Sequence, residues 1–162
     1  MKNFAVKVKL ICCGKTVDSF LTEGELNYQN RLKHYFSFER IDLPDLKNTK
    51  NLSEEQIKEE EGKRILKEIQ TNQELILLDE RGKNFTSVEF ASFLTNHFNY
   101  HQRDIIFLIG GPYGFSEKVY ERANAKMSLS KMTFSHQMVR MIFLEQLYRA
   151  ATIIKGEPYH HE

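Results

Sequence analysis

The sequence has no tryptophan, only two cysteines and three prolines, and little net charge, since its charged residues sum to +1 at pH 7. A balance this close to neutral excludes a strongly polybasic nucleic-acid binder, although it is compatible with a local basic patch. The apolar runs fall well short of the roughly 20 residues of a membrane-spanning helix, so none is expected. The opening MKNFAVKVKL alternates like a strand and lacks the long apolar core of a secretory signal, so we expect a cytoplasmic protein.

Cysteine and histidine are too sparse, and too poorly placed, to indicate a metal centre. Cys12 and Cys13 are adjacent within an apolar stretch instead of spaced as a CxxC pair, so we predict buried, reduced thiols. His97 and His101 have the i, i+4 spacing of metal ligands, but no cysteine or third ligand accompanies them. Their position near a predicted helix end is explained more simply by compensation of the helix dipole. No metal is predicted.

Stretches of two kinds alternate along the chain. Apolar runs typical of strands occupy residues 4–13, 36–43, 74–79, 105–109 and 127–130. Helical patterns occupy residues 18–35, 53–69, 86–99, 117–126 and 135–156. Strands that alternate with helices predict an α/β fold whose mostly parallel sheet is flanked by helices on both faces. Residues 1–162 are expected to form a single domain.

Local motifs mark three of the predicted helix ends. Ser53 with Gln56, and Thr86 with Glu89, have the spacing of capping boxes, in which each side chain bonds the backbone N–H of the other residue. Gly156 is expected to end the last helix, because glycine readily adopts the left-handed conformation found there.

Two further boundaries are predicted from weaker signals. The polar segment ERGK (80–83) follows the buried run at 74–79 and is predicted to be a turn. Ser116 is expected to cap the helix at 117–126, since a serine before a helical pattern commonly accepts a bond from the first turn.

Ligands of parallel sheets bind beyond the carboxyl ends of the strands, which here are the loops after Leu78, Ile109 and Leu129. One of these loops, GGPYG (110–114), matches neither GxxxxGK[ST] nor GxGxxG, and Pro112 lacks the backbone N–H that a phosphate nest would use. A stiff glycine turn lets the backbone approach a flat, uncharged group such as an adenine. On these residues alone, a merely tight strand-to-helix turn is an equally good interpretation.

The segments SLSKMTFSHQMVR (128–140), EQLYRA (145–150) and GEPYHHE (156–162) are much more specific. With them the chain resembles the ribosomal RNA large subunit methyltransferase H family, small SPOUT-class enzymes that methylate N3 of a pseudouridine in 23S ribosomal RNA. The resemblance runs essentially from end to end, and the earlier matching segments, in order, are GKT, YQNRLKHY, EEEGKRIL, LLDERGK and FLIGGPYG.

The resemblance implies a SPOUT-type C-terminal trefoil knot over approximately residues 74–162, in which three loops hold S-adenosylmethionine. Carried onto matching positions, the cofactor-binding residues would be Leu78, Gly110, Leu129, Ser130, Lys131, Met132, Thr133 and Phe134. These positions fall at the three strand ends named above. The family usually has proline before the histidine of this segment, where the present chain has Ser135, and a hydroxyl cap can replace the ring there.

The catalytic candidates are Arg149, Tyr159, His160 and His136. The imide N–H of the acceptor is a weak acid, so a base, or a cation that stabilises its anion, would help at neutral pH. Arg149 could stabilise that anion or clamp a phosphate, or it could simply pair with Glu145 on a helix surface. Given the resemblance, Tyr159 is expected to stack on or orient the base, and His160 to accept the proton or contact RNA. His136 fits a helix start or a substrate contact equally well.

A partner is expected for the predicted helix at 135–156, because it is apolar around most of its surface and one sheet would leave part of it uncovered. The family that the chain resembles forms homodimers in which each site is completed across the interface. Residues 115–162 contain a mild excess of basic residues, which suits binding to large-subunit ribosomal RNA within an assembled ribosome. We expect the protein to recognise this RNA by its shape and to form salt-sensitive contacts with its phosphates.

Two other functions compete with methyl transfer. A noncatalytic RNA-binding or ribosome-associated homodimer of the same fold would keep the basic surface but would not bind S-adenosylmethionine. A nucleotide-dependent oxidoreductase would need an acidic residue for the ribose and a phosphate-binding loop, and the sequence shows neither.

Overall fold

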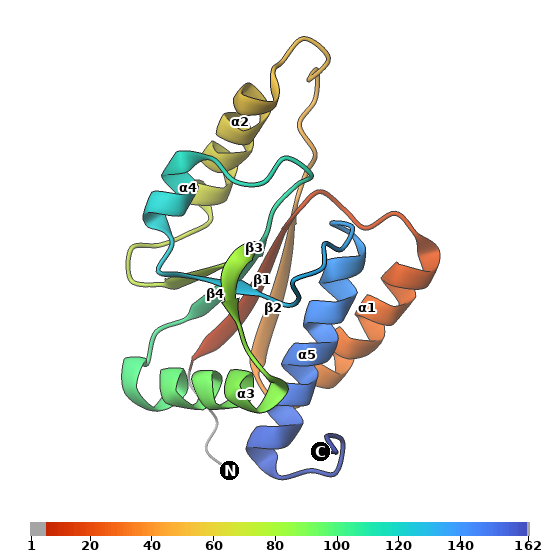
Figure 1. Ribbon diagram of the computed structural model, residues 1–162, viewed down its shortest axis with the longest axis vertical. Coiled ribbons are helices and arrows are strands. Elements are labelled where there is room, and N and C mark those ends of the chain that lie inside the picture. The colour runs from red at the N-terminus through yellow and green to blue at the C-terminus, as the bar shows by residue number, and fades with distance from the viewer. Residues whose placement is uncertain (1–5, 162) are drawn as a thin grey trace.

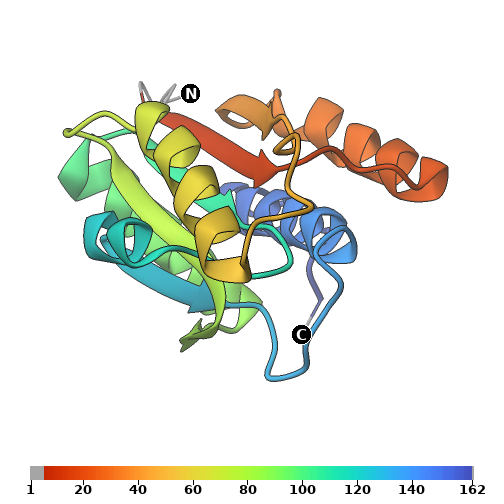
Figure 2. The ribbon, with the colours of Figure 1, turned by 90° about the horizontal axis from the view of Figure 1, so that it is seen from above.

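Helices cover both faces of a central five-stranded sheet (Figure 1 and Figure 2). The computed structural model describes residues 6–161. Its strands are β1 (Lys7–Cys13), β2 (Ser37–Leu43), β3 (Glu74–Asn84), β4 (Ile105–Ile109) and β5 (Ala125–Ser128). Its helices are α1 (Ser19–Leu32), α2 (Glu54–Lys67), α3 (Ser87–Asn96), α4 (Glu117–Arg122) and α5 (Met138–Lys155), with a π-helical turn, η1, at His97–His101. The predicted α/β class is confirmed.

The strands lie in the order β2-β1-β4-β3-β5, and every neighbouring pair is parallel. β4 lies at the centre, and every residue of Ile105–Ile109 is buried. A strand covered on both faces requires such a continuous apolar run. Because parallel strands end at the same edge of a sheet, the carboxyl ends of β4, β3 and β5 are neighbours.

Alternate residues of β4 contribute to two apolar cores, one on each face of the sheet. Phe107 belongs to the core beneath α1, α3 and α5, where the centroid of its ring lies 4.9 Å from that of Phe143. Leu108 belongs to the core beneath α2 and α4, together with Ile65 and Val119. Figure 1 shows the corresponding grouping of the helices, with α2 and α4 together and apart from α1, α3 and α5.

Both predicted capping boxes are present. Ser53 Oγ accepts from the N–H of Gln56 (3.2 Å), and Gln56 Oε1 accepts from the N–H of Ser53 (2.9 Å). Thr86 Oγ1 accepts from the N–H of Glu89 (3.1 Å), and the Glu89 carboxylate accepts from the N–H of Thr86 (2.7 Å). Gly156 follows α5 with a left-handed φ of 67°, as predicted. Local motifs therefore located these three helix ends correctly.

The predicted turn at ERGK (80–83) is wrong, because β3 continues through this segment. The pairing of β3 with β5 shifts register between Leu78 and Lys83, which produces an irregularity in the strand and not its end. A Cβ at Gly82 would lie 2.5 Å from the backbone nitrogen of Met127, so glycine permits this close approach. The extension depends on a distant edge strand, which the local pattern of residues 80–83 does not reveal.

The helix predicted at 117–126 is shorter in the structure, and the strand predicted at 127–130 begins and ends earlier. Asn124 explains the change, because its N–H donates to the Leu75 oxygen and its Oδ1 accepts from the Leu75 N–H, both at 2.8 Å. The chain therefore joins the edge of β3 at this point. Ser116 precedes α4 as expected, but its side chain forms no capping bond.

Other boundaries differ by a few residues. Regular helix in α3 ends at Asn96 and gives way to η1, after which Gln102 has a left-handed φ of 50°. The described part of the strand predicted at 4–13 begins at Lys7, and residues 4 and 5 lie outside the described residues. Within residues 6–161, no helix is long and apolar enough to cross a membrane.

α5 begins at Met138, slightly later than predicted, and Ser135 Oγ accepts a bond from the Met138 N–H (3.1 Å). The helices α1 and α3 flank α5, and α1 approaches so closely that a Cβ at Gly24 would lie 2.5 Å from Met141 Sδ. Much of the apolar surface of α5 is therefore covered within the same chain. Its apolar sequence by itself does not require a partner.

The prediction of buried, reduced thiols is confirmed for Cys12 and Cys13. Burial is the main cause that raises the pKa of each thiol to about 12. Both side chains are therefore protonated at neutral pH, a state in which they are poor nucleophiles.

Candidate functional site

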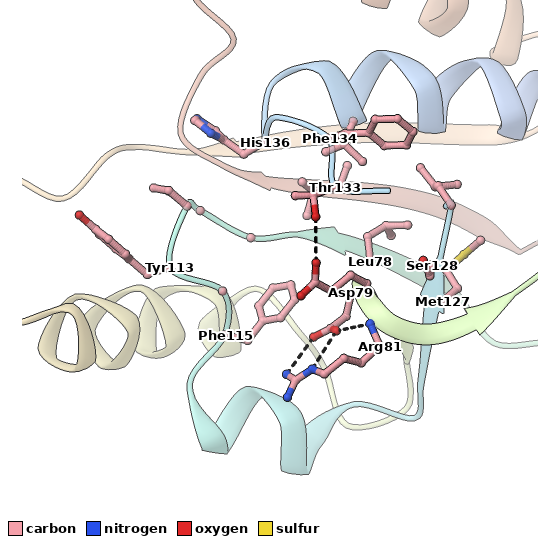
Figure 3. A pocket seen from close by; sticks show the side chains of 18 of the residues that line it. Leu78, Asp79, Arg81, Tyr113, Phe115, Met127, Ser128, Thr133, Phe134 and His136 are labelled. Carbon is pink, nitrogen blue, oxygen red and sulfur yellow. Dashed lines mark hydrogen bonds and ion pairs between the residues drawn. The ribbon is translucent and has the colours of Figure 1, made fainter. Parts of the chain in front are cut away.

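The loops that follow β3, β4 and β5 line one pocket of about 890 Å³ (Figure 3). They converge because β4, β3 and β5 are neighbours in the sheet and end at the same edge. The volume falls within the roughly 300–1,000 Å³ of small-molecule sites. The prediction that the three strand ends share a pocket is therefore confirmed.

Most of the predicted cofactor-binding residues form the wall of this pocket. Seven of the eight line it: Leu78, Gly110, Leu129, Ser130, Met132, Thr133 and Phe134. Lys131 lies in the same loop as the last five but does not line the pocket. Among the catalytic candidates, His136 lies in the wall next to that loop.

The glycines of the GGPYG turn serve different purposes. Gly114 has a φ of 81°, and its N–H donates to the Gly111 oxygen at 3.2 Å, which closes the turn around Pro112. A Cβ at Gly110 would lie 2.8 Å from the buried ring of Phe115, so glycine is needed there for packing. The turn carries no lysine and has no N–H at Pro112, so it suits an uncharged ring better than a phosphate.

The loop after β5 is ordered by its own hydroxyl groups. Ser128 Oγ donates to the Ser130 oxygen (2.7 Å), and Ser130 Oγ accepts from the Met132 N–H (2.9 Å). Thr133 Oγ1 donates to Glu80 Oε2 on β3 at 3.2 Å (Figure 3). This last bond joins two walls of the pocket, and sequence reasoning missed Glu80 because it lies in the segment interpreted as a turn.

Asp79 lies beside Glu80 in the pocket wall, and its charge is already satisfied. The Tyr120 hydroxyl donates to Asp79 Oδ2 (2.5 Å), and the backbone N–H of Arg81 donates to Asp79 Oδ1 (2.8 Å). Burial would raise the pKa of Asp79, but the hydrogen bonds from Tyr120 and Arg81 lower it overall. Asp79 is therefore ionised at neutral pH and held by these partners.

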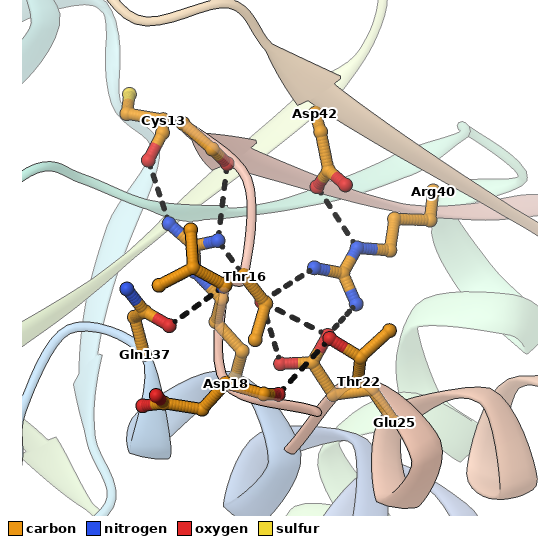
Figure 4. Close-up of polar contacts among 11 residues, drawn as sticks. Cys13, Thr16, Asp18, Thr22, Glu25, Arg40, Asp42 and Gln137 are labelled. Atoms are coloured by element: carbon orange, nitrogen blue, oxygen red, sulfur yellow. Dashed lines mark hydrogen bonds and ion pairs between the residues drawn. The ribbon is translucent and has the colours of Figure 1, made fainter. Parts of the chain in front are cut away.

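A buried polar network fixes the start of α5 next to the pocket (Figure 4). Arg140 is fully buried and donates to the Cys13 backbone oxygen (2.6 Å) and to Thr16 Oγ1 (3.2 Å). Thr16 also bonds Glu25, whose carboxylate pairs with Arg40 at 2.5 Å. The network ties the first turn of α5 to the end of β1 and the residues that follow it. No local sequence signal indicates this role for Arg140.

Three catalytic candidates, Arg149, Tyr159 and His160, lie together near the end of α5. Glu145 Oε1 accepts from Arg149 Nη2 (2.6 Å) and from the Tyr159 hydroxyl (3.0 Å). The Arg149 guanidinium lies 4.7 Å from the centroid of the Tyr159 ring, and its Nη1 lies 3.3 Å from His160 Nδ1. Arg149 therefore does pair with Glu145, as the structural alternative to a functional role predicted. The same pair also holds Tyr159, through Glu145, and His160, through Arg149.

The segment after α5 is attached to the body of the protein by aromatic contacts. Tyr35 donates to Glu157 Oε2 (2.5 Å), and the Tyr159 ring packs edge-on against Tyr148 at 4.7 Å. Burial and hydrogen bonds raise the pKa of Tyr159, so its hydroxyl is protonated at neutral pH and does not act as a base. Sequence reasoning gave Tyr35 and Tyr148 no role, because no local pattern shows that they contact the segment after α5, although both lie in segments that carry the family resemblance.

The two sets of candidates lie at opposite ends of α5. Val139 lines the pocket, and Arg149 follows ten residues later, which places it about 15 Å further along the helix axis. Figure 1 shows the C-terminal segment at the far end of α5 from the loop that precedes the helix. One chain therefore brings His136 to the pocket but leaves Arg149, Tyr159 and His160 outside it.

The histidines considered as metal ligands have other contacts. His97 Nε2 bonds the Arg103 backbone oxygen (2.7 Å), and its ring stacks on that of His101 with centroids 5.3 Å apart. Among the residues that the structure describes, no group of three or more potential ligands is placed to hold a metal ion.

A family model described as "Predicted SPOUT methyltransferase" matches residues 6–160. The match covers the whole parallel sheet and all three loops that line the pocket. The chain belongs to the SPOUT methyltransferase family.

Curated relatives narrow the assignment further. The chain is 56% identical over 156 residues to the Ribosomal RNA large subunit methyltransferase H of Cytophaga hutchinsonii, covering 96% of this chain and 100% of the relative. It is 54% identical over 157 residues to the protein of that name from Parabacteroides distasonis, covering 97% and 100%. The corresponding protein of Bacteroides thetaiotaomicron is 50% identical over 157 residues, with the same coverage. These comparisons confirm the family resemblance indicated by the sequence segments.

Proposed function

We propose that the protein transfers a methyl group from S-adenosylmethionine to N3 of a pseudouridine in 23S ribosomal RNA, in the cytoplasm and on the assembled ribosome. The observation that carries this proposal is the pocket at the ends of β3, β4 and β5, because residues at the family's cofactor-binding positions line it. The names of the relatives support ribosomal RNA as the substrate.

The pocket suits S-adenosylmethionine in its chemistry. Leu78, Leu129 and Phe134 offer apolar surface to an adenine ring, and the turn at Gly110 lets the backbone approach that ring closely. The loop at 129–134 lies beside these side chains, and the hydrogen bonds of Ser128 and Ser130 hold its backbone in place. When bound, S-adenosylmethionine supplies a methyl group activated by its sulfonium.

The protein's own residues must hold the acceptor base, exclude water and manage one proton. Arg149 stabilises the anion of the base, since Glu145 holds its guanidinium in a fixed orientation. Tyr159 presents an aromatic ring on which the base stacks. His160 accepts the N3 proton or contacts the RNA, and His136 contacts the substrate from the pocket wall.

The active form is a homodimer in which the tail of one copy completes the pocket of the other. The tail is the last part of α5, from Glu145 onward, together with the segment that follows the helix. This arrangement is supported by the separation of about 15 Å between the pocket and Arg149 along α5. Exposed apolar side chains also need cover, because Met132 in the pocket wall and Val17 and Phe20 around the start of α1 are 76%, 75% and 61% exposed. Burial of such side chains is a typical feature of subunit interfaces.

The cofactor-binding part of the chain is a trefoil knot over approximately residues 74–162, within a single domain that spans residues 1–162. The range from residue 74 onward contains all three loops that line the pocket, which supports this assignment.

Mass mapping of 23S ribosomal RNA tests the proposal. Ribosomes from a strain that lacks the modification are incubated with the purified protein and S-adenosylmethionine, and we expect one methyl group to appear on N3 of a pseudouridine. Unmethylated RNA, together with no heat of S-adenosylmethionine binding in calorimetry, would instead indicate a noncatalytic RNA-binding homodimer.

A further inference from the structure

The pocket carries more negative than positive charge. Its lining includes four carboxylates and two cations: Glu55, Asp79, Glu80, Glu117, Lys58 and Arg81. Both cations are already engaged, because Lys58 Nζ lies 2.8 Å from Glu55 Oε2 and Arg81 Nε lies 3.3 Å from Asp79 Oδ1. The uncompensated charge is therefore carried by the other two carboxylates.

These two carboxylates have different surroundings. Glu117 lies in the first turn of α4, where the partial positive charge of the helix end favours it. Glu80 lies within β3, after the buried residues of that strand, and its carboxylate accepts a hydrogen bond from Thr133. Within the described part of the chain, Glu80 forms no ion pair. It is thus an ionisable group held in the pocket wall without a cation.

The position of Glu80 is defined by the loops that would hold the cofactor. It lies two residues after Leu78, and its bond to Thr133 joins the wall formed by β3 to the wall formed by the 129–134 loop (Figure 3). Glu80 is exposed and lines the pocket, so its carboxylate lies at the open side of the space between these walls. A cationic ligand group in that space would gain a charge-assisted hydrogen bond or ion pair there.

We propose that the Glu80 carboxylate binds the positive charge on the amino-acid half of S-adenosylmethionine. The inference rests on the proposed function and adds the residue that recognises the charged part of the donor. S-adenosylmethionine carries a sulfonium and an ammonium in this half, and the neutral glycine turn at 110–114 offers neither of them a counter-charge. Glu80 supplies the missing counter-charge and so favours the charged donor over uncharged nucleosides.

Calorimetry on the whole protein with three probes tests this role without measuring methyl transfer. The probes are S-adenosylmethionine, S-adenosylhomocysteine, which lacks the sulfonium, and 5′-methylthioadenosine, which lacks both cationic groups. For Glu80→Gln we expect S-adenosylmethionine to bind about tenfold more weakly, the size of effect expected when a charged hydrogen bond becomes neutral. The affinity for 5′-methylthioadenosine should not change.

S-adenosylhomocysteine identifies which cationic group Glu80 binds. An equal loss for S-adenosylhomocysteine assigns the contact to the ammonium, and an unchanged affinity assigns it to the sulfonium; both results support the proposal. The same loss for all three probes, including 5′-methylthioadenosine, would overturn it, since Glu80 would then act on the nucleoside or on the shape of the pocket. An unchanged affinity for S-adenosylmethionine would overturn it as well.

Glu121→Gln is the matched control. It makes the same change of charge on α4, and Glu121 is exposed like Glu80 but does not line the pocket, so all three affinities should stay at wild-type values. An equal effect of Glu121→Gln would show that net charge, and not Glu80, governs binding. If the wild-type protein binds none of the probes, the proposed function fails; wild-type binding with an unaffected Glu80→Gln overturns only the present inference.

Discussion

The two ends of α5 differ in what they contribute, although one helix joins them. At the first end, the network around Arg140 fixes the approach to a pocket suited to a small molecule. At the other end, Glu145 holds Arg149 and Tyr159 in a group that presents a cation and an aromatic ring. About 15 Å of helix separates the two. From this difference we expect that cofactor binding and chemistry on the base can be damaged independently.

Arg149→Ala should have the largest effect, because it removes the cation at the tail end and leaves the pocket end intact. We expect methyl transfer to fall by about 100-fold or more, as when a group that stabilises developing charge is lost. S-adenosylmethionine affinity should be unchanged. Single-turnover assays on ribosomes and calorimetry measure the two quantities.

Arg31→Ala is the control for this variant. The Arg31 guanidinium also lies over a tyrosine ring, at 5.3 Å from the centroid of Tyr148, but it belongs to α1. Its removal should leave both quantities near wild type. If Arg149→Ala weakened cofactor binding as much as transfer, the two ends would not be separable.

Gly110→Val damages the pocket end instead. Its side chain would meet the ring of Phe115, since even a Cβ would lie 2.8 Å from that ring. We expect S-adenosylmethionine to bind more than about tenfold more weakly, and overpacking to lower the free energy of unfolding by about 1–3 kcal/mol. Calorimetry and denaturant titration give the two values.

Gly156→Ala is the counterpart at the tail end. Gly156 has a positive φ, so alanine would be strained by about 1–2 kcal/mol, but the space around it is open. This variant should lose stability to a similar extent while its cofactor affinity stays at the wild-type level. Equal losses of affinity in both variants would show that the affinity follows stability and not the pocket.

The pH dependence should also distinguish the two ends. The pKa of Asp79 is lowered from 3.8, so this carboxylate contributes stability above that value and loses it as the pH falls through the lower folded value. Asp79 is therefore fully ionised between about pH 6 and 8 and adds no pH dependence to cofactor binding there, whereas transfer should rise severalfold because the acceptor N–H must ionise. Parallel pH profiles for affinity and transfer would contradict this separation.

Tyr35→Phe should have the smallest effect. It removes the bond to Glu157 that helps to hold the segment after α5, a loss of about 1 kcal/mol of stability at most. We expect transfer to slow by about two- to threefold with unchanged cofactor affinity. Tyr100→Phe, at a side chain that is 81% exposed, should change neither quantity. A loss of affinity in Tyr35→Phe would contradict the assignment of Tyr35 to the tail end.

The pocket end was easier to predict from the sequence than the tail end. The buried run of β4, the turn at 110–114 and the capping boxes are local patterns, and each produces the same local structure in the fold. The carboxyl ends of β3, β4 and β5 therefore lie together around one pocket, as predicted. The family segments added the identities of the pocket residues, seven of which line the observed cavity.

The remaining features depend on contacts between residues that are distant in the sequence. Tyr35 and Glu157 are 122 positions apart, and Arg140 reaches an oxygen of Cys13, 127 positions away. The extension of β3 through 80–83 likewise requires its pairing with β5. A local pattern carries no information about such partners, so neither the attachment of the tail to Tyr35 nor the network around Arg140 could be predicted.

The central proposal, that the pocket of one copy works with the tail of another, is tested most directly by combining two variants that are each impaired at a different end of α5. Arg149→Ala retains an intact pocket, and Gly110→Val retains an intact tail. When they are co-expressed, random pairing makes about half of the dimers mixed, each with one complete site, so the account predicts about a quarter of wild-type methyl transfer. Mixed dimers detected by native mass spectrometry with no more activity than either variant alone would contradict it.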